Sequence, residues 1–210
     1  MVAMPGSNPI SSWKSLREGN DRFVNGTLEH PGQGVADRAK LVQGQHPTAI
    51  LFGCGDSRVA AELIFDRGLG DMFVVRTAGH VVDGSVLGSI EYGVAVLNVP
   101  LIVVLGHDSC GAVKATIDTL DGGAVPGGFI RDVVERVAPS ILAGRREGLS
   151  TVDELEARHV VETGNLIIER SAIVAERVKA GTLAIACVNY KLAEGKAWLH
   201  HVIGDVGEAV

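Results

Sequence analysis

Three side chains of types that bind metals stand out in this chain by their spacing. Cys54 is the first, and His107 and Cys110 follow further along in a His-x-x-Cys pattern. Two thiolates and one imidazole suit zinc, which prefers sulfur and nitrogen ligands in a tetrahedral shell. Three protein ligands leave a fourth position, which holds water in catalytic sites and a further side chain in structural sites. The sequence therefore predicts a zinc site at Cys54, His107 and Cys110.

A carboxylate and a guanidinium follow the first of these cysteines. Asp56 lies two residues after Cys54, and Arg58 lies four residues after it. If Arg58 holds Asp56 away from the metal, Asp56 can accept a hydrogen bond from a metal-bound hydroxide and orient it. If that pair breaks, Asp56 can itself ligate the metal and expel the water. An ordinary loop ion pair, which is common and weak, is the alternative, but the neighbouring cysteine favours a functional pair.

Other interpretations of these residues stay open at this point. Asp56 could permanently complete a structural zinc site, or the two cysteines could be buried beside a surface histidine. A dinucleotide-binding fingerprint beginning at Gly53 is disfavoured, because its third glycine would fall at Arg58, whose side chain prevents close helix packing. Thiol redox chemistry is disfavoured because Cys54 and Cys110 do not form a Cys-x-x-Cys arrangement.

The apolar pattern indicates the elements that must position these side chains. Short apolar runs rich in β-branched residues predict buried strands, and they lie at residues 48–52, 72–75, 101–105 and 183–188. Residues 84–97 carry apolar side chains at helical spacing, so strand and helix alternate, as in α/β folds. Two further strands around a turn, at 187–192 and 196–199, predict an antiparallel edge. We expect a mainly parallel central sheet flanked by helices.

This arrangement explains how distant ligands can meet. Cys54 and His107 each follow a predicted strand, and the carboxyl ends of parallel strands form the crevice where open α/β sheets place their sites. Cys110 falls at the expected start of a helix, where the helix dipole favours a thiolate. We therefore expect all three ligands at one edge of the sheet.

Other segments receive no chemistry from the sequence. Residues 129–142 and 152–178 are predicted to be helical, and His159 is expected on an exposed face of the second helix. Asn8 and Pro9 form the cap and first turn of an N-terminal amphipathic helix, which is a candidate for packing on a partner subunit. Cys187 lies inside an apolar run and is expected to be a buried small residue. His80 receives no assigned role.

Composition and charge narrow the class of protein. The chain has 210 residues, 46% hydrophobic and 21% charged, which suits one domain spanning residues 1–210. The net charge is -6 and the basic residues are dispersed, so nucleic acid is not an expected partner. No apolar stretch approaches the length of a membrane span, and the start lacks a secretory pattern. A cytoplasmic location and no membrane partner are expected.

Three blocks of the sequence together resemble the β-class carbonic anhydrases. They are residues 54–58 (Cys-Gly-Asp-Ser-Arg), 76–79 (Arg-Thr-Ala-Gly) and 106–111 (Gly-His-Asp-Ser-Cys-Gly). The blocks occur in the order found in that family, and the resemblance extends from the N-terminal helix to the terminal strands. The combination of Cys-x-Asp-x-Arg with His-x-x-Cys is specific.

The resemblance implies a carbonate dehydratase, a zinc lyase that reversibly hydrates carbon dioxide to bicarbonate and a proton. In such an enzyme zinc-bound hydroxide attacks the carbon dioxide, and Asp56 and Arg58 gate the fourth zinc position. One zinc ion per subunit, a homodimer or homotetramer, and a zinc site at each subunit boundary are also implied. Residues 1–30 would then form a helical arm on a neighbouring subunit.

The resemblance also assigns a substrate pocket. It places the following residues there: Gln45 as an amide donor, and Phe73, Ala78 and Tyr92 as the apolar lining. Without the resemblance, Gln45 would be a solvated loop residue and the two aromatic residues would belong to the core. Some family members bind regulatory bicarbonate through a tryptophan three positions before the first zinc cysteine. Leu51 occupies that position and argues against this form of regulation.

Overall fold

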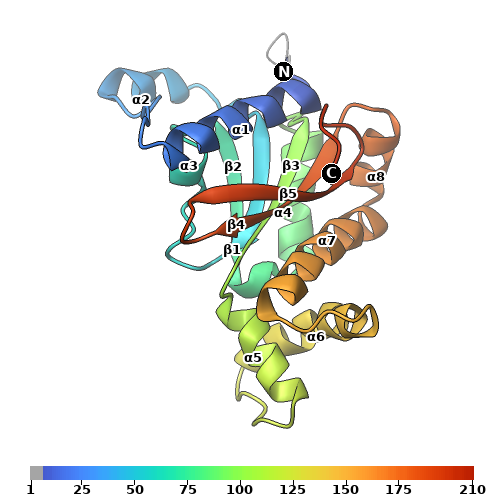
Figure 1. Ribbon diagram of the computed structural model, residues 1–210. Coiled ribbons are helices and arrows are strands. Elements are labelled where there is room, and N and C mark those ends of the chain that lie inside the picture. Colours follow the sequence, from blue (N-terminus) through green and yellow to red (C-terminus); the bar gives the residue numbers. More distant parts are fainter. Residues whose placement is uncertain (1–6) are drawn as a thin grey trace.

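A five-stranded sheet forms the centre of the computed structural model, which describes residues 7–210 (Figure 1). The strand order is β2-β1-β3-β4-β5. The strands are β1 (Ala49–Cys54), β2 (Met72–Thr77), β3 (Leu101–His107), β4 (Ala184–Lys191) and β5 (Lys196–Ile203). The pairs β1–β2, β1–β3 and β3–β4 are parallel, and β5 is antiparallel to β4. This confirms the expected α/β fold with an antiparallel edge.

Helices connect the strands and cover the sheet. They are α1 (Pro9–Val24), α2 (Val35–Leu41), α3 (Ala61–Ile64), the short 3₁₀ helix η1 (Ala78–His80), α4 (Gly84–Ala95), α5 (Gly111–Leu120), α6 (Ile130–Arg146), α7 (Val152–Arg170) and α8 (Ala172–Lys179). The helix expected over 152–178 is interrupted, because Ser171 has extended backbone angles (φ -110°, ψ 105°). The Ser171 side chain then accepts a hydrogen bond from the backbone N–H of Val174 and caps α8.

The central strands are buried on both faces, which explains their nearly continuous apolar sequences. Successive side chains point to opposite faces of a strand. Leu51 packs in the core formed with α1 and α3, whereas Ile50 and Phe52 pack in the core formed with α4, α7 and α8. The two layers of helices leave the carboxyl ends of the parallel strands to α5, α6 and η1. In Figure 1, α5 and α6 lie at the lower end of the molecule.

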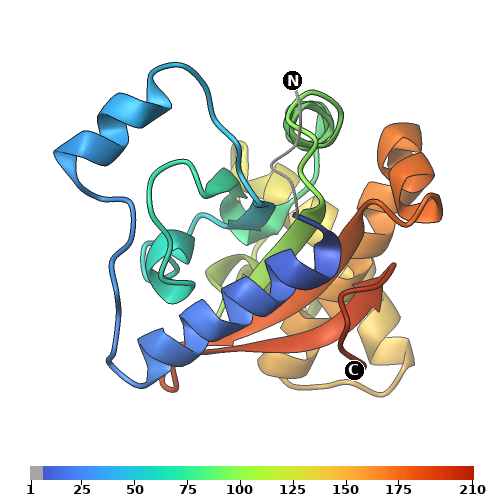
Figure 2. The same ribbon diagram turned by 90° about the horizontal axis from the view of Figure 1, so that it is seen from above.

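The N-terminal helix packs on its own chain. Figure 2 shows α1 crossing the sheet. Trp13 and Leu16 on α1 are each only 1% exposed within the core of the same subunit, and the Trp13 indole donates to Glu208 near the C-terminus. By contrast, α2 buries no residue and stands apart from the rest of the chain (Figure 2). Residues 1–6 of the expected arm lie outside the described part of the chain, and contact with a partner subunit stays a prediction.

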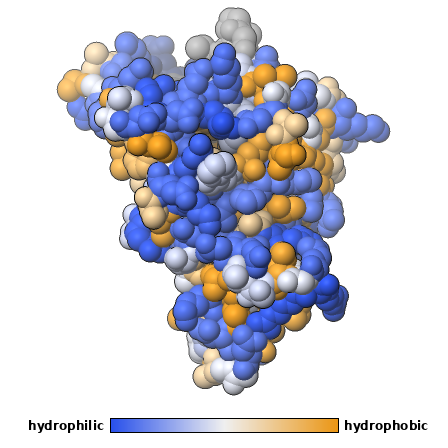
Figure 3. Space-filling model, viewed as in Figure 1, coloured by the Kyte–Doolittle hydropathy of each residue, from blue (hydrophilic) through white to orange (hydrophobic). Residues whose placement is uncertain are grey.

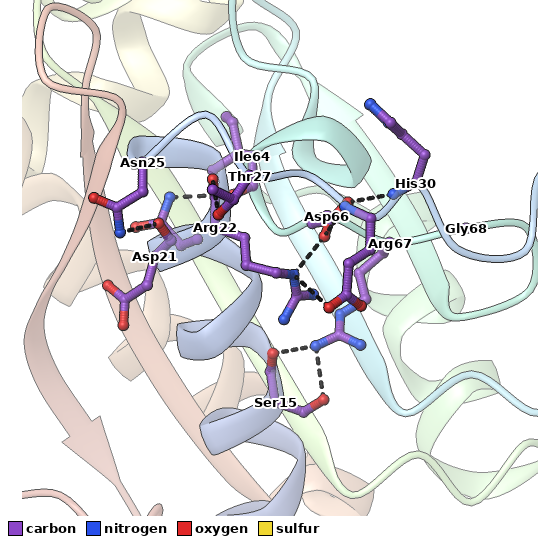
Figure 4. A network of polar contacts seen from close by, with 12 residues as sticks. Ser15, Asp21, Arg22, Asn25, Thr27, His30, Ile64, Asp66, Arg67 and Gly68 are labelled. Carbon is purple, nitrogen blue, oxygen red and sulfur yellow. Dashed lines mark hydrogen bonds and ion pairs between the residues drawn. The ribbon is translucent and has the colours of Figure 1, made fainter.

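A polar network ties the end of α1 to the segment after α3 (Figure 4). The Asp66 side chain is 1% exposed and accepts hydrogen bonds from Arg22 Nε at 2.6 Å and from the backbone N–H groups of Glu29 and His30 at 3.0 Å each. Burial raises the pKa of Asp66, but these hydrogen bonds outweigh it and the pKa is lowered. The adjacent Arg67 donates to Ser15 on α1. The network therefore fixes α1 and the following loop to the segment after α3.

The surface seen in Figure 3 is largely hydrophilic, with several hydrophobic patches among the hydrophilic residues. Within residues 7–210, no helix is long and apolar enough to cross a lipid bilayer.

Candidate metal centre

The three expected ligands converge at the carboxyl ends of two neighbouring strands. Cys54 ends β1 and His107 ends β3, and these strands pair in parallel. Cys110 is the N-cap residue of α5. The ligand atoms of all three side chains lie within 4.8 Å of one another, and all three residues are buried. The fold therefore brings together residues that the sequence separates widely.

The electrostatics of the centre favour a thiolate. The adjacent Cys110 thiol lowers the pKa of Cys54 to about 4, against the opposing effect of burial. The backbone N–H groups of Asp56 and Gly79 act in the same direction as Cys110. In return, the Cys54 sulfur and burial raise the pKa of Cys110. The pair therefore favours one thiolate even before a metal ion binds.

The His107 ring is oriented for coordination. Its Nδ1 lies 2.8 Å from the carbonyl oxygen of Asp108, and a carbonyl can only accept, so Nδ1 carries the proton. Nε2 is then the basic nitrogen of the neutral ring. It is buried and has no hydrogen-bond partner among residues 7–210. Buried polar atoms rarely go unpartnered, so Nε2 is the atom available for a metal ion.

Asp56 and Arg58 form the expected pair beside this centre. Arg58 Nε donates to Asp56 Oδ1 at 2.9 Å, and Nη2 donates to Oδ2 at 2.7 Å. The Arg58 guanidinium holds the pKa of the Asp56 carboxyl well below its usual range. Asp56 Oδ2 also lies 3.8 Å from His107 Nε2. The carboxylate is therefore placed between the guanidinium and the ligand atoms.

Arg76 has a role here that the residues alone did not reveal. Its Nε donates to the carbonyl oxygen of Cys54 at 2.9 Å, and its Nη2 donates to that of Asp56 at 2.5 Å. Arg76 lies near the end of β2, next to β1, so it can brace the loop that follows the first ligand. The only signal in the sequence was its place at the start of the block at residues 76–79.

One residue of α7 reaches the centre, and a second lies in the layer behind it. Glu156 is fully buried and accepts a hydrogen bond from the backbone N–H of His107 at 3.2 Å. Burial raises the pKa of Glu156 to about 8. The expectation that His159 lies on an exposed helix face is wrong, because α6 and η1 cover that face of α7. His159 is 4% exposed and contacts Ser140 and Gly79.

The proposed substrate residues fall into two places within one chain. Ala78 lies in η1, directly after Thr77, which pairs with Cys54 in the sheet. The Phe73 and Tyr92 rings pack together with centroids 6.1 Å apart. Phe73 pairs with Ile50 at the amino end of β1, whereas Cys54 pairs with Thr77. At about 3.3 Å per residue, the four steps from Phe73 to Thr77 span roughly 13 Å.

Gln45 precedes the amino end of β1, whereas the metal ligands lie at the carboxyl ends of the strands. It is exposed in the loop that leads to the amino end of β1. A single chain therefore does not bring Gln45, Phe73 and Tyr92 to its own metal centre.

A sequence model of the family described as carbonic anhydrase matches residues 49–197, which is more than half of the chain. The chain belongs to the carbonic anhydrase family. Carbonic anhydrase 2 of Mycobacterium tuberculosis (strain ATCC 25618 / H37Rv) is 63% identical over 207 residues, covering 99% of this chain and 100% of that protein. A carbonic anhydrase of Mycolicibacterium smegmatis is 63% identical over 205 residues, with 98% and 100% covered.

More distant relatives confirm the resemblance to the β class. Beta carbonic anhydrase 3 of Arabidopsis thaliana is 32% identical over 204 residues, covering 90% of this chain and 77% of that protein. A tetrameric β-carbonic anhydrase of Sordaria macrospora aligns with a TM-score of 0.71 at 21% identity, covering 90% of this chain and 96% of the other. The β-carbonic anhydrase CafA of Aspergillus fumigatus has a TM-score of 0.71 at 24% identity, with 95% and 93% covered. At these identities the structures show the shared fold.

The residues of this carbonic anhydrase fit a bound metal ion. The centre combines two sulfur atoms and one imidazole nitrogen within 4.8 Å of one another. Nε2 of His107 is buried and without a hydrogen-bond partner in the described part of the chain. Sulfur and nitrogen donors in this ratio suit zinc, and three of them leave a fourth position for another ligand.

Proposed function

We propose that this chain catalyses the reversible hydration of carbon dioxide to bicarbonate and a proton, with one zinc ion held by Cys54, His107 and Cys110. The observation that carries the proposal is the convergence of these three ligand atoms within 4.8 Å beside the Asp56–Arg58 pair. Zinc bound there would supply a Lewis acid that lowers the pKa of water and provides a nucleophile near neutral pH. The protein supplies the orientation of the nucleophile, the substrate pocket and control of access to the metal.

Asp56 and Arg58 control access to the fourth ligand position of the metal. With the bidentate pair intact, Asp56 is held as a hydrogen-bond acceptor that can orient the attacking group. Without the Arg58 guanidinium, only the backbone N–H of residue 58 would still bind the carboxylate, which lies 3.8 Å from Nε2 of His107. Asp56 would then close the fourth position. The pair is thus a gate with an open and a closed arrangement.

A second copy of the chain completes the substrate pocket. Carbon dioxide is small and apolar, so it needs an apolar lining and a donor for the carboxylate that develops from it. Phe73 and Tyr92 offer the lining and Gln45 offers the donor, while Ala78 lines the same pocket from the side of the metal. Tyr92 is 47% exposed, and β2 is an edge strand, so both are available to a partner. The assembly is a homodimer, or a tetramer built from such dimers.

The chain acts as one domain over residues 1–210 in the cytoplasm, with neither nucleic acid nor membrane as a partner. Support comes from the net charge of -6 and from three cysteines that are free thiols in the described residues. Free thiols and a thiolate metal site suit a reducing compartment.

Stopped-flow measurement of carbon dioxide hydration with a pH indicator tests the proposal. Wild-type protein assayed for zinc is compared with Cys54→Ala at about pH 7 and about pH 9. Fast turnover that requires zinc and vanishes in Cys54→Ala supports the proposal. Absence of turnover despite a full complement of zinc contradicts it. Parallel assays with carbonyl sulfide and carbon disulfide then separate a different linear substrate from a closed structural site.

A further inference from the structure

We propose that His159 is a positioning residue for the metal centre: with Ser140 it holds the η1 turn in place between the end of β1, which carries Cys54, and α5, which follows Cys110. This inference rests on the zinc site of the proposed function and extends it to a pair of buried residues on α6 and α7. Neither residue touches a metal ligand, so both act through the turn.

The hydrogen bonds of His159 define a single state of its ring. Nε2 lies 2.9 Å from the carbonyl oxygen of Gly79, and Nδ1 lies 2.8 Å from Oγ of Ser140. Because a carbonyl only accepts, Nε2 carries the proton and donates a hydrogen bond to the Gly79 carbonyl oxygen. Nδ1 is then an acceptor, and the Ser140 hydroxyl donates to it. Burial lowers the pKa of His159, which keeps the ring in this neutral form.

The turn that His159 holds has an unfavourable backbone. Gly79 has φ 61° and His80 has φ 40°, so two successive residues lie in the left-handed region. For a residue with a side chain, such as His80, that conformation costs roughly 1–2 kcal/mol. The His80 ring is buried and packs on the His159 ring with centroids 4.3 Å apart. Such a turn persists only where its surroundings impose it, and the His159 hydrogen bond is one of those restraints.

The same turn touches the metal centre from two sides. Thr77, the residue before the turn, pairs with Cys54 in the sheet, and its carbonyl oxygen accepts a hydrogen bond from the Gly55 N–H at 2.8 Å. A β-carbon on Gly79 would lie 2.7 Å from the β-carbon of Ala112, which is two residues after Cys110 in α5. A shift of Gly79 would therefore disturb the backbone beside one ligand and press on the helix that another ligand caps. His159 and Ser140 fix the turn from α7 and α6, on the side away from the ligands.

Three variants separate positioning from folding. His159→Phe keeps a planar ring but loses both hydrogen bonds, Ser140→Ala removes one partner, and His159→Gln retains an amide that can donate to Gly79. Thr163→Val, one turn further along α7 and also buried, is the matched control. Zinc affinity is measured by competition with a chromogenic chelator. Absorption spectra of the cobalt-substituted proteins report the thiolate–metal geometry independently of turnover.

We expect His159→Phe to weaken zinc binding by about tenfold and to alter the cobalt–thiolate bands, since residues that orient metal ligands typically contribute 10–100-fold. His159→Gln should recover most of the affinity, Ser140→Ala should lose part of it, and Thr163→Val should match the wild type. If His159→Phe does not fold, Ser140→Ala and His159→Gln decide the question.

Wild-type zinc affinity and an unchanged cobalt spectrum in both His159→Phe and Ser140→Ala would overturn the proposal. Equal losses of zinc affinity in His159→Gln and His159→Phe would also overturn it if these losses parallel a fall in melting temperature. That result would indicate a purely structural role. A wild-type protein that binds zinc but does not hydrate carbon dioxide contradicts the proposed function alone, and the affinity test still applies.

Discussion

Arg58 holds both carboxylate oxygens of Asp56, with Nε–Oδ1 at 2.9 Å and Nη2–Oδ2 at 2.7 Å. The same carboxylate faces His107, with Oδ2 3.8 Å from Nε2. Asp56 is thus poised between a cation that restrains it and the ligand set of the metal centre. Because both contacts involve one carboxylate, a change at Arg58 alters the position of Asp56 directly.

Replacing Arg58 tests the gate. Arg58→Ala should lower kcat/KM for carbon dioxide hydration by about 100-fold while zinc stays bound, because the freed Asp56 occupies the fourth position. Arg58→Lys should be intermediate, since an ammonium cannot pair with both oxygens in the same way. Stopped-flow assays between pH 7 and 9 and zinc analysis measure both effects. Arg131→Ala, which breaks an exposed helix pair with Glu135, is the control. Near-normal activity of Arg58→Ala across this range contradicts the gate.

Replacing the cysteines one at a time tests the ligand assignment. Cys54→Ala and Cys110→Ala should each lose most bound zinc, because two protein ligands cannot retain it against a chelator. Cys187→Ala should keep one zinc per chain, since Cys187 is buried in the core between the sheet and α7 rather than at the centre. Elemental analysis after dialysis against a chelator measures the outcome. Zinc loss in Cys187→Ala comparable to that in Cys54→Ala would exclude the proposed ligand set.

Mixed assemblies test whether two chains share each substrate pocket. Cys54→Ala and Gln45→Ala are expected to be nearly inactive as homodimers. A heterodimer of the two, isolated through different tags, contains one pocket with both an intact metal centre and an intact Gln45 if these come from different chains. It should therefore recover about half of the wild-type rate. If both residues served one pocket within the same chain, the heterodimer would be as inactive as its parents.

The buried Asp66 carboxylate should contribute strongly to stability. Asp66→Asn removes the charge that pairs with Arg22 and replaces one acceptor oxygen by an NH2 group, which cannot accept from the nearby donors. It should therefore lower the free energy of unfolding by about 2–4 kcal/mol. Because the folded pKa of Asp66 lies below its ordinary value of 3.8, this contribution is complete above 3.8 and is lost as the pH falls through the folded pKa. Urea unfolding at neutral pH and below pH 4 measures both. The exposed Asp118→Asn should change stability by less than about 0.5 kcal/mol, and an equal loss in the two variants would refute the role of Asp66.

The sequence by itself determined the features that depend on local pattern. Apolar runs with β-branched residues predicted the parallel strands, because a strand buried on both faces must be apolar almost throughout. The types of Cys54, His107 and Cys110 predicted the metal centre, because few other side chains suit zinc. Their positions at strand ends predicted where the centre would lie, because parallel strands share a carboxyl edge.

Only the tertiary structure decided which distant residues support that centre. Ser140 on α6 and Gly79 in η1 meet at His159, and no local pattern in α7 distinguishes a histidine that faces another helix from one that faces water. The structure likewise placed Phe73 at the opposite end of β1 from the metal ligands. The physical reason is that the residue type sets the chemistry a side chain can perform, whereas its neighbours are set by the packing of helices and strands from the whole chain.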